Sequence, residues 1–488
     1  MQTEQPNIVF IFTDQLRADS IGVPAESPVI TPNLNRIAAE GTTFTRFMSN
    51  SPLCVPARAA IMTGQLPREN GVWSNRLGAD PSGPSHVRNI RDVGYHTAVI
   101  GKTHLWRDGP AGKPGRHVRE REDNLTAWGF EFSQEVNDPI GTRNQGCYYT
   151  DYLEGNGWLD AHRDYINAWV LEMRTGNVRP WDQRPAPVPR GEDIDSYIGR
   201  SAVEWLRRYE ADTPFYLQIQ FTGPHDPFDA PAHYRELYDP GVLDPGLMQP
   251  HSAPLPTIES RQKRFAAVFD ATREQRQRWR AWYYANITLI DDWIGQVLGV
   301  LNDRGQLDNT WIIFNSDHGE MLGDHGLWGK AVFYKEAVRV PCIVRPPTGS
   351  TASGCHRLVQ HIDLPVTMID IAGARPLANT LGRSLLDDLD KEKPPTPDND
   401  FVISELFGQA TVITDTLKLT AQLEDLQPVQ LFDLNTDPNE LQNVVVDPQY
   451  SGTIRDLTEF FLRPLEVRTD GEKFADYRHY VNETGSRN

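Results

Sequence analysis

The chain has few cysteines and no long apolar run. Its 488 residues contain four cysteines, Cys54, Cys147, Cys342 and Cys355, and no CxxC pair or zinc-binding spacing. Four scattered cysteines in a chain of this length do not make a disulfide framework, so we expect them to be reduced. No apolar run reaches the length of a membrane span, so we expect no membrane partner. The N-terminal residues lack the basic start and apolar core of a secretion signal, and we expect a cytoplasmic protein.

Basic residues are also scarce relative to acidic ones. The chain has 48 Lys and Arg against 66 Asp and Glu, a formal net charge of -18. Nucleic-acid binding needs a basic face, so nucleic acid is excluded as the main partner. An anionic substrate would need a local cluster of positive side chains, because the overall field repels it.

Four short runs rich in β-branched and aromatic residues predict buried parallel strands. They span residues 7–12, 96–101, 214–221 and 310–316. Helical patterns lie between them, at residues 31–41, 195–210 and 279–301. Thr31 is expected to be the N-cap of the first helix, with Gly41 just past its end. Strands alternating with helices favour an α/β fold with a large, mostly parallel or mixed sheet flanked by helices.

A proline-rich, charged stretch at residues 390–400 predicts a linker. Short strand-like runs follow it, at residues 401–406 and 417–423. We therefore expect a catalytic domain of residues 1–389 and a smaller α+β subdomain of residues 390–488 with an antiparallel sheet, a helix and a polar tail. The tail is too polar to form a core, so it is either loose or lies on a partner.

Ionisable residues follow each predicted strand directly. Ligands in open α/β sheets bind beyond the carboxyl ends of the strands, so the four strand ends predict one pocket. The residues at these ends are Asp14, then Lys102 and His104, then His225 and Asp226, and finally Asp317 and His318.

Cys54 opens the segment C-V-P-A-R. Pro56 is tolerated in the first turn of a helix, so Cys54 should lie at a helix N-terminus, where free N–H groups and the helix dipole attract anions. Arg58 projects from the same face and can bind oxyanions through two hydrogen bonds. This arrangement favours a nucleophile beside an anion site; the alternative is a buried structural cysteine.

Taken together, the motifs resemble those of the type I sulfatases of the alkaline phosphatase superfamily. The signature C-x-P-[SA]-R, followed by Thr-Gly, stands at residues 54–58 and 63–64. Other family motifs are resembled by GKTHLW (101–106), GPHDPF (223–228), NSDHGEMLGDHGLWGK (315–330) and LFDLNTDPNELQNV (431–444). The resemblance covers most of the chain and implies an alkaline-phosphatase-like sandwich that hydrolyses sulfate esters, as arylsulfatases do.

A modified nucleophile is implied by the same resemblance. A maturation enzyme oxidises the motif cysteine of sulfatases to Cα-formylglycine, so Cys54 is expected to become an aldehyde whose hydrate carries two hydroxyls. One hydroxyl attacks sulfur and expels the alcohol, and deprotonation of the other releases sulfate. The expected partners are a small-molecule sulfate ester and the formylglycine-generating enzyme.

One divalent metal ion is also implied. Its ligands would be Asp14, Gln15, Asp317, His318 and an oxygen of modified Cys54. Hard oxygen ligands favour Ca²⁺, and the imidazole makes Mn²⁺ the second choice. Many family members have Asp-Asp in place of Asp14-Gln15 and Asn in place of His318.

Five further side chains have implied catalytic roles. Arg58 would hold the formylglycine hydrate, and Lys102 and Lys330 would bind the sulfate oxygens. His104 would be the base that deprotonates the second hydroxyl, and His225 would act on the leaving oxygen as general acid or hydrogen-bond donor.

Weaker candidates surround these. Asn75 either reaches the pocket rim or belongs to a turn, and Asp324 and His325 would support the metal ligands. Residues 106–190 are expected to build the pocket wall. Within them, residues 147–158 would offer aromatic walls for an aryl or quaternary ammonium group, or form an ordinary packing cluster.

Two other functions stay open. A phosphonate monoester or phosphodiester hydrolase of the same superfamily can use the same nucleophile; Gln15 and His318 resemble that branch, whereas Lys102 and His104 speak against it. An unmodified chain that only binds sulfated ligands is disfavoured, because all the catalytic positions are filled. Relatives without signals often assemble through their tails, so we expect a homo-oligomer, either a dimer or a tetramer.

Overall fold

All four predicted strands are present and adjacent. The computed structural model describes residues 5–23, 27–106, 117–247, 255–389 and 401–466. The strands are β4 (His96–Gly101), β6 (Phe215–Gln220), β1 (Asn7–Thr13) and β7 (Thr310–Ser316), in that order across the sheet. All pairings among them are parallel, so their carboxyl ends meet at one edge.

Further strands make the sheet mixed. Its full order is β5-β4-β6-β1-β7-β8-β2-β9. Here β5 (Phe132–Glu135) runs parallel to β4, whereas β8 (Cys342–Arg345) is antiparallel to both β7 and β2 (Thr42–Phe44). At the far edge β9 (Ser353–Cys355) is parallel to β2, and β3 (Phe47–Met48) pairs separately with β10 (Val359–Gln360). This confirms the α/β fold class.

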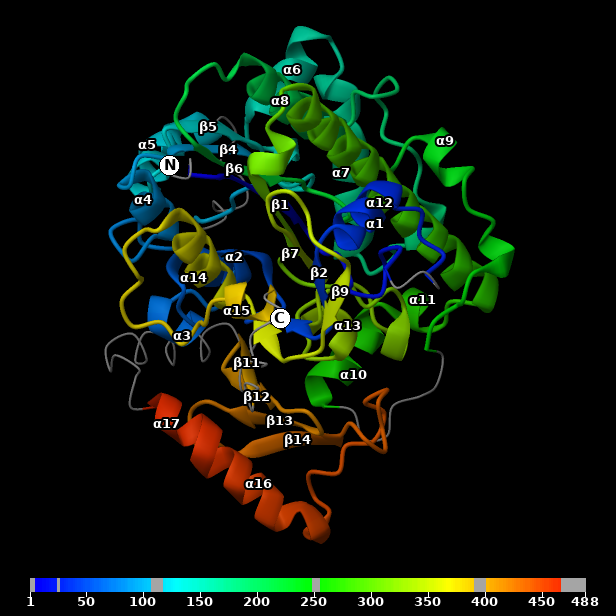
Figure 1. Cartoon of the computed structure of the whole chain (residues 1–488). Helices are drawn as coiled ribbons and strands as arrows, with labels where there is room; N and C mark the ends of the chain where they lie inside the picture. The colour runs from blue at the N-terminus through cyan, green and yellow to red at the C-terminus, as the bar shows by residue number, and fades with distance from the viewer. Residues whose placement is uncertain (1–4, 24–26, 107–116, 248–254, 390–400, 467–488) are drawn as a thin grey trace.

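Helices cover both faces of the sheet (Figure 1). One face carries α1 (Pro32–Ala39), α8 (Ile194–Arg208) and α12 (Arg273–Asp303), and the other carries α2 (Cys54–Thr63), α4 (His86–Arg91) and α14 (Asp363–Ala372). Further α-helices are α3 (Pro67–Asn70), α5 (Glu122–Trp128), α6 (Tyr148–Gly155), α7 (Leu159–Arg174), α9 (Ala232–Arg235), α10 (Pro256–Arg264), α11 (Ala266–Phe269), α13 (Lys335–Val338) and α15 (Leu386–Leu389). No described helix has the length and apolar character that crossing a membrane requires.

Helix α1 lies where the sequence predicts it, but the predicted cap is wrong. The hydroxyl of Thr31 makes no cap and accepts instead from the N–H of Gly22 at 2.7 Å. The carboxylate of Asp291 on α12 accepts from the N–H groups of Asn33 and Leu34 at 3.0 and 2.8 Å. A tertiary contact thus satisfies the groups that a local cap would otherwise have served.

The C-terminal part forms a second, antiparallel sheet of β11 (Val402–Leu406), β12 (Gln409–Ile413), β13 (Leu417–Gln422) and β14 (Pro428–Asp433). Helices α16 (Ser451–Leu457) and α17 (Arg463–Glu466) lie along it (Figure 1). One apolar cluster joins Ile403 and Leu431 of this sheet to Ala60 of α2, so the sheet packs directly beside the helix that begins at Cys54. Residues 390–400 and 467–488, which include the predicted linker and tail, lie outside the described residues, and the domain boundary stays a prediction.

Candidate active site

Helix α2 begins at Cys54, as the sequence predicts. Leu53 before it is extended, and Gly64 ends the helix with φ 68°, a left-handed conformation that glycine adopts without strain. The side-chain oxygen of Asn75 accepts from the N–H of Val55 at 3.0 Å. Asn75 therefore satisfies a free N–H group in the first turn of the nucleophile helix.

Four potential metal ligands meet at this helix end. The donor atoms of Asp14, Cys54, Asp317 and His318 all lie within 4.8 Å of one another, and all four residues are buried. Cys54 Sγ is 3.2 Å from His318 Nε2 and 3.8 Å from Asp14 Oδ1.

His318 is oriented for ligation. Its Nδ1 lies 3.0 Å from the carbonyl oxygen of Gly319, which can only accept, so Nδ1 carries a proton and Nε2 is the ring nitrogen that faces Cys54. Two buried carboxylates and this imidazole nitrogen fit a single divalent cation.

Arg58 links the two carboxylates of this cluster. Its Nε donates to Asp317 Oδ2 at 2.9 Å and its Nη2 donates to Asp14 Oδ2 at 3.1 Å. Its Nη1 donates to Gln220 Oε1 at 2.8 Å and to the carbonyl oxygen of Lys102. One guanidinium therefore ties together the ends of β1, β4, β6 and β7.

The two predicted lysines supply the local positive charge that an anionic substrate would need in a protein of negative net charge. Lys102 Nζ donates to Asp14 Oδ2 at 2.6 Å, and Lys330 Nζ donates to Gln15 Oε1. Burial opposes their charge, but Asp14 and Cys54 raise the pKa of both ammonium groups above its usual range.

Positively charged neighbours also change the pKa of the Cys54 thiol. Burial alone would raise the pKa of Cys54, but Lys330, Lys102 and His318 hold it well below its usual range. Position 54 is therefore a place where negative charge is stabilised.

Gln15 has a left-handed backbone conformation, which is uncommon for residues other than glycine. Its φ is 70°, and its N–H donates to Asp317 Oδ1 at 3.0 Å. Its amide nitrogen donates to Asp226 Oδ1 at 3.0 Å and to Glu320 Oε2, while its oxygen accepts from Lys330. The amide thus lies against Lys330, and its role as a metal ligand stays a prediction.

The two predicted catalytic histidines sit on loops after β4 and β6. His104 has φ 48°, and the Glu135 carboxylate accepts from the backbone N–H of Thr103 at 3.0 Å, with the His104 N–H at 3.5 Å. Burial raises the pKa of Glu135 to about 7. His225 Nδ1 lies 2.8 Å from the carbonyl oxygen of Asp226. Burial and Lys330 lower the pKa of His225, but Asp226 and Asp14 outweigh them and raise it to about 9.

Several neighbouring groups were not predicted from the sequence. Glu135 ends β5, whose four residues FSQE are too short and polar to give a strand pattern. Asp138 follows it, with Oδ2 3.9 Å from Lys102 Nζ; burial would raise the pKa of Asp138, but Lys102 and His104 lower it. Gln220 was visible only as one of two glutamines that alternate with apolar residues in β6.

The role of Asp324 and His325 as supports of the metal ligands stays a prediction. Asp324 pairs with Arg17 at 2.6 Å and Arg280 at 2.8 Å, and His325 stacks on Tyr334 with ring centroids 3.9 Å apart. In the segment of residues 147–158, Tyr149 is buried in the main apolar core, which favours the packing alternative. All four cysteines are free thiols; Cys355 is half-buried and the others are buried.

Comparisons with known proteins agree with this geometry. Residues 6–374 match the family model Sulfatase, and residues 323–464 match the model N-sulphoglucosamine sulphohydrolase, C-terminal. The chain is 29% identical over 478 residues to an arylsulfatase of Clostridium perfringens (strain 13 / Type A), covering 96% of each chain. It is 30% identical over 470 residues to a choline-sulfatase of Rhizobium meliloti (strain 1021), covering 92% of this chain and 84% of that one.

A solved structure shares the fold. A phosphonate monoester hydrolase of Agrobacterium radiobacter matches with a TM-score of 0.77 and 24% identity, covering 95% of this chain and 96% of that one. The family match spans the start of α2 at Cys54 and the strand ends that carry Asp14, Lys102, His225 and Asp317. The chain therefore belongs to the sulfatase family and is a hydrolase of that family.

Proposed function

We propose that this enzyme hydrolyses small sulfate esters through a Cα-formylglycine made from Cys54, with one divalent cation at Asp14, Gln15, Asp317 and His318. The observation that carries the proposal is the position of Cys54 Sγ, 3.2 Å from His318 Nε2 at the start of α2. The modification converts the side chain CH₂–SH to CHO with loss of the sulfur, and a separate oxidising maturation enzyme carries it out. The cation, Ca²⁺ first and Mn²⁺ second, supplies Lewis-acid polarisation when bound.

The surrounding cations have complementary tasks. Lys102 and Lys330 bind the sulfate oxygens, where negative charge grows during S–O cleavage. Arg58 holds Asp14 and Asp317 in place and offsets their charge. Lys102, Arg58 and the two carboxylates are buried and Lys330 is half-buried, and the same charges would interact far more weakly in water.

Proton transfers fall to the two histidines. His225, whose pKa is raised to about 9, carries a proton near neutral pH and donates it to the leaving oxygen. His104 accepts the proton whose removal releases sulfate. The Glu135 carboxylate holds the backbone of residues 103–104 and thereby fixes where the imidazole lies.

A phosphonate monoester or phosphodiester hydrolase is the second candidate. The observation in its favour is the pair Gln15 and His318, which resembles that branch. A sulfate ester and a phosphonate monoester each carry one negative charge, so the charge of the site does not separate them. Direct comparison of substrates is therefore needed.

The test combines peptide mass and a substrate panel. The tryptic peptide that contains residue 54 should carry formylglycine in active protein. Among 4-nitrophenyl sulfate, choline sulfate, 4-nitrophenyl phenylphosphonate and bis(4-nitrophenyl) phosphate, a sulfate ester should have the highest kcat/KM. Unmodified cysteine in fully active protein would refute the nucleophile, and a higher kcat/KM for the phosphonate would favour the second candidate.

Substitution of the nucleophile provides the matched control. Cys54→Ala should lower kcat by about a thousandfold or more, since no covalent step remains. Cys355→Ala changes a half-buried thiol at the far edge of the sheet and should leave kcat unchanged. Full activity of the Cys54→Ala protein would contradict the proposal.

A further inference from the structure

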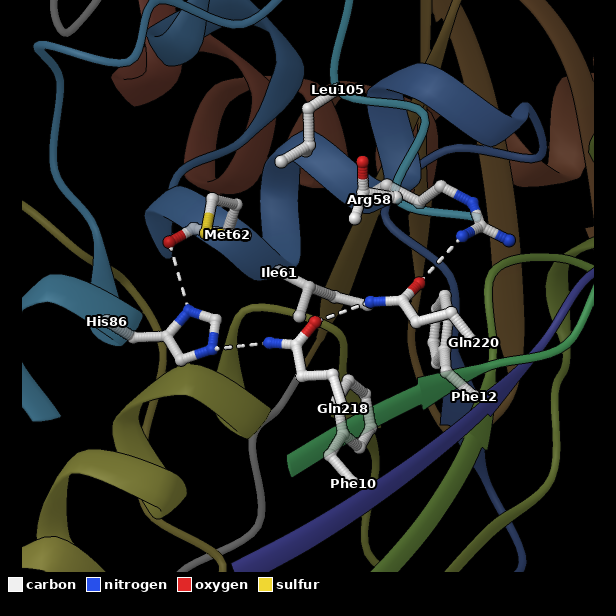
Figure 2. Close-up of a pocket in the computed structure, with 10 residues that line it drawn as sticks. Phe10, Phe12, Arg58, Ile61, Met62, His86, Leu105, Gln218 and Gln220 are labelled. Carbon is white, nitrogen blue, oxygen red and sulfur yellow. Dashed lines mark hydrogen bonds between the residues drawn. The ribbon is translucent and has the colours of Figure 1, made fainter. Parts of the chain in front are cut away.

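We propose that Gln220 is a positioning residue that orients Arg58, as the first link of a buried hydrogen-bond chain that leaves helix α2 at Arg58 and returns to it at Met62. The inference rests on the proposed role of Arg58 beside Cys54. Figure 2 shows the links from Arg58 to Gln218 and from His86 to Met62, along the wall of a small cavity, together with a longer contact of 3.5 Å between Gln218 Nε2 and His86 Nε2.

The first half of the chain runs along β6. Arg58 Nη1 donates to Gln220 Oε1 at 2.8 Å, and Gln220 Nε2 donates to Gln218 Oε1 (Figure 2). Gln218 Nε2 donates in turn to the hydroxyl of Tyr216 at 2.7 Å. Tyr216, Gln218 and Gln220 are alternate residues of one strand, so their side chains share one face of the sheet.

The second half returns to the helix. His86 Nδ1 lies 3.1 Å from the carbonyl oxygen of Met62, which can only accept, so Nδ1 carries the proton. Burial lowers the pKa of His86 to about 4, so the ring is neutral and its Nε2 is an acceptor. The Tyr216 hydroxyl lies 2.8 Å from that Nε2 and donates to it; the Met368 sulfur, 3.2 Å away, is a weaker acceptor.

Every link therefore has the same direction. A donor faces an acceptor from Arg58 to Met62, and each group that accepts from one neighbour donates to the next. Reversing the Gln220 amide would put its NH₂ against the Arg58 guanidinium, donor against donor, inside a buried site. The fixed ends at His86 and Met62 thus determine which atom Gln220 presents to Arg58.

This chain of hydrogen bonds fixes the orientation of the Arg58 guanidinium. With Nη1 held by Gln220, Arg58 keeps Nε for Asp317 and Nη2 for Asp14. The main chain of Gln220 holds the neighbouring cation as well, because its carbonyl accepts from the N–H of Lys102 at 2.9 Å. A Cβ at Gly101, where φ is 111°, would overlap that carbonyl, so the close approach of β4 and β6 requires glycine here.

Substitution of Gln220 tests the inference. Gln220→Met keeps the length of the side chain and removes both the acceptor oxygen and the donor nitrogen of the amide. With 4-nitrophenyl sulfate we expect kcat to fall about 10- to 100-fold and KM to change less than about threefold, because the geometry at position 54 loosens while sulfate binding by Lys330 remains. Gln277→Met is the matched control: Gln277 on α12 is 5% exposed against 6% for Gln220, and its amide donates to the carbonyl oxygens of Leu243 at 2.7 Å and Gly241 at 3.4 Å, away from Arg58. This control should leave kcat unchanged.

A double-mutant cycle separates positioning from general damage. Arg58→Lys removes the guanidinium group that Gln220 orients. In the Arg58→Lys background, Gln220→Met should therefore lower kcat less than about threefold. An equal loss in both backgrounds, with Arg58→Lys itself impaired, would overturn the inference and leave the proposed function standing. Wild-type kcat for Arg58→Lys would refute the proposed role of Arg58 and the inference with it.

A second variant covers the case in which Gln220→Met does not fold. Gln218→Met breaks the next link and leaves the contact between Gln220 and Arg58 in place. We expect a smaller fall in kcat that Arg58→Lys again suppresses. A fall of equal size in both backgrounds would overturn the inference.

Discussion

His318 Nε2 lies 3.2 Å from Cys54 Sγ, and the same nitrogen lies 3.8 Å from Asp14 Oδ1 and 3.6 Å from Asp317 Oδ1. One ring nitrogen therefore faces the nucleophile position and both carboxylates. Without a cation, two buried carboxylates would depend on neighbouring side chains for compensation, with Arg58 and Lys102 in direct contact and His225 and Lys330 farther away. A bound cation should stabilise the protein as well as activate the reaction.

Chelation tests that expectation. Dialysis against EDTA should abolish sulfate release and lower Tm, because a ligand of the folded state alone is lost. Ca²⁺ or Mn²⁺ should restore both, and metal analysis should find about one ion per chain. In His318→Asn, the activity with Mn²⁺ relative to Ca²⁺ should fall, since a hard oxygen replaces the imidazole. Unchanged activity and Tm after metal removal would contradict the site.

Substitution of His104 should separate the two chemical steps. His104→Ala should release about one equivalent of 4-nitrophenol per active site and then stall, because the first bond cleavage does not need this base but the release of sulfate does. Rapid-mixing absorbance measures the burst. His96→Ala, at the opposite end of β4, should show steady turnover. Loss of substrate binding with normal turnover in His104→Ala would show that the assigned role is wrong.

Asp324 should contribute mainly to stability. Its carboxylate is buried between Arg17 and Arg280, which lower its pKa although burial opposes them. Asp324→Asn leaves two guanidinium groups buried near each other, and we expect a loss of about 3 to 5 kcal/mol in the free energy of unfolding. Denaturant titration measures it. Asp182→Asn, which breaks an exposed pair with Arg278 at 3.7 Å, should leave the midpoint unchanged.

Stability should fall below neutral pH through buried histidines. His162 is 4% exposed, and burial lowers its pKa to about 4. An unfolded histidine binds its proton near pH 6.5, so between about pH 6.5 and 4 the unfolded state binds more protons and stability drops as the pH falls.

The contribution of His162 reaches at most about 3 kcal/mol at pH 4. Urea midpoints at pH 7 and pH 5 should therefore differ less in His162→Gln than in wild type. Substituting the partly exposed His96 by Gln should leave the difference as it is. An identical pH dependence in all three proteins would show that His162 does not contribute.

The strand-end residues show how far sequence reasoning reaches. Asp14, Lys102, His225 and Asp317 were predicted to meet because parallel strands end at one edge, and the computed structure brings them together. The start of α2 at Cys54 was equally predictable, because proline in a first helical turn is a local signal. Such features follow from periodicity and backbone chemistry.

Partners from distant elements were not predictable in this way. Asp291 replaces Thr31 at the start of α1, and Glu135 holds the backbone of His104 from a strand with no strand pattern. These contacts join residues far apart in the chain, and no local pattern encodes them.

The sequence by itself determined the strands, the nucleophile helix and the chemical types gathered at the sheet edge, since each depends on neighbours within a few residues. Only the tertiary structure decided which acceptor each cation takes: Gln15 for Lys330, and Gln220 with two carboxylates for Arg58. The physical reason is that a hydrogen bond needs a suitable donor and acceptor and also the correct orientation of both. Inside a buried site, all the groups packed around a side chain determine that orientation.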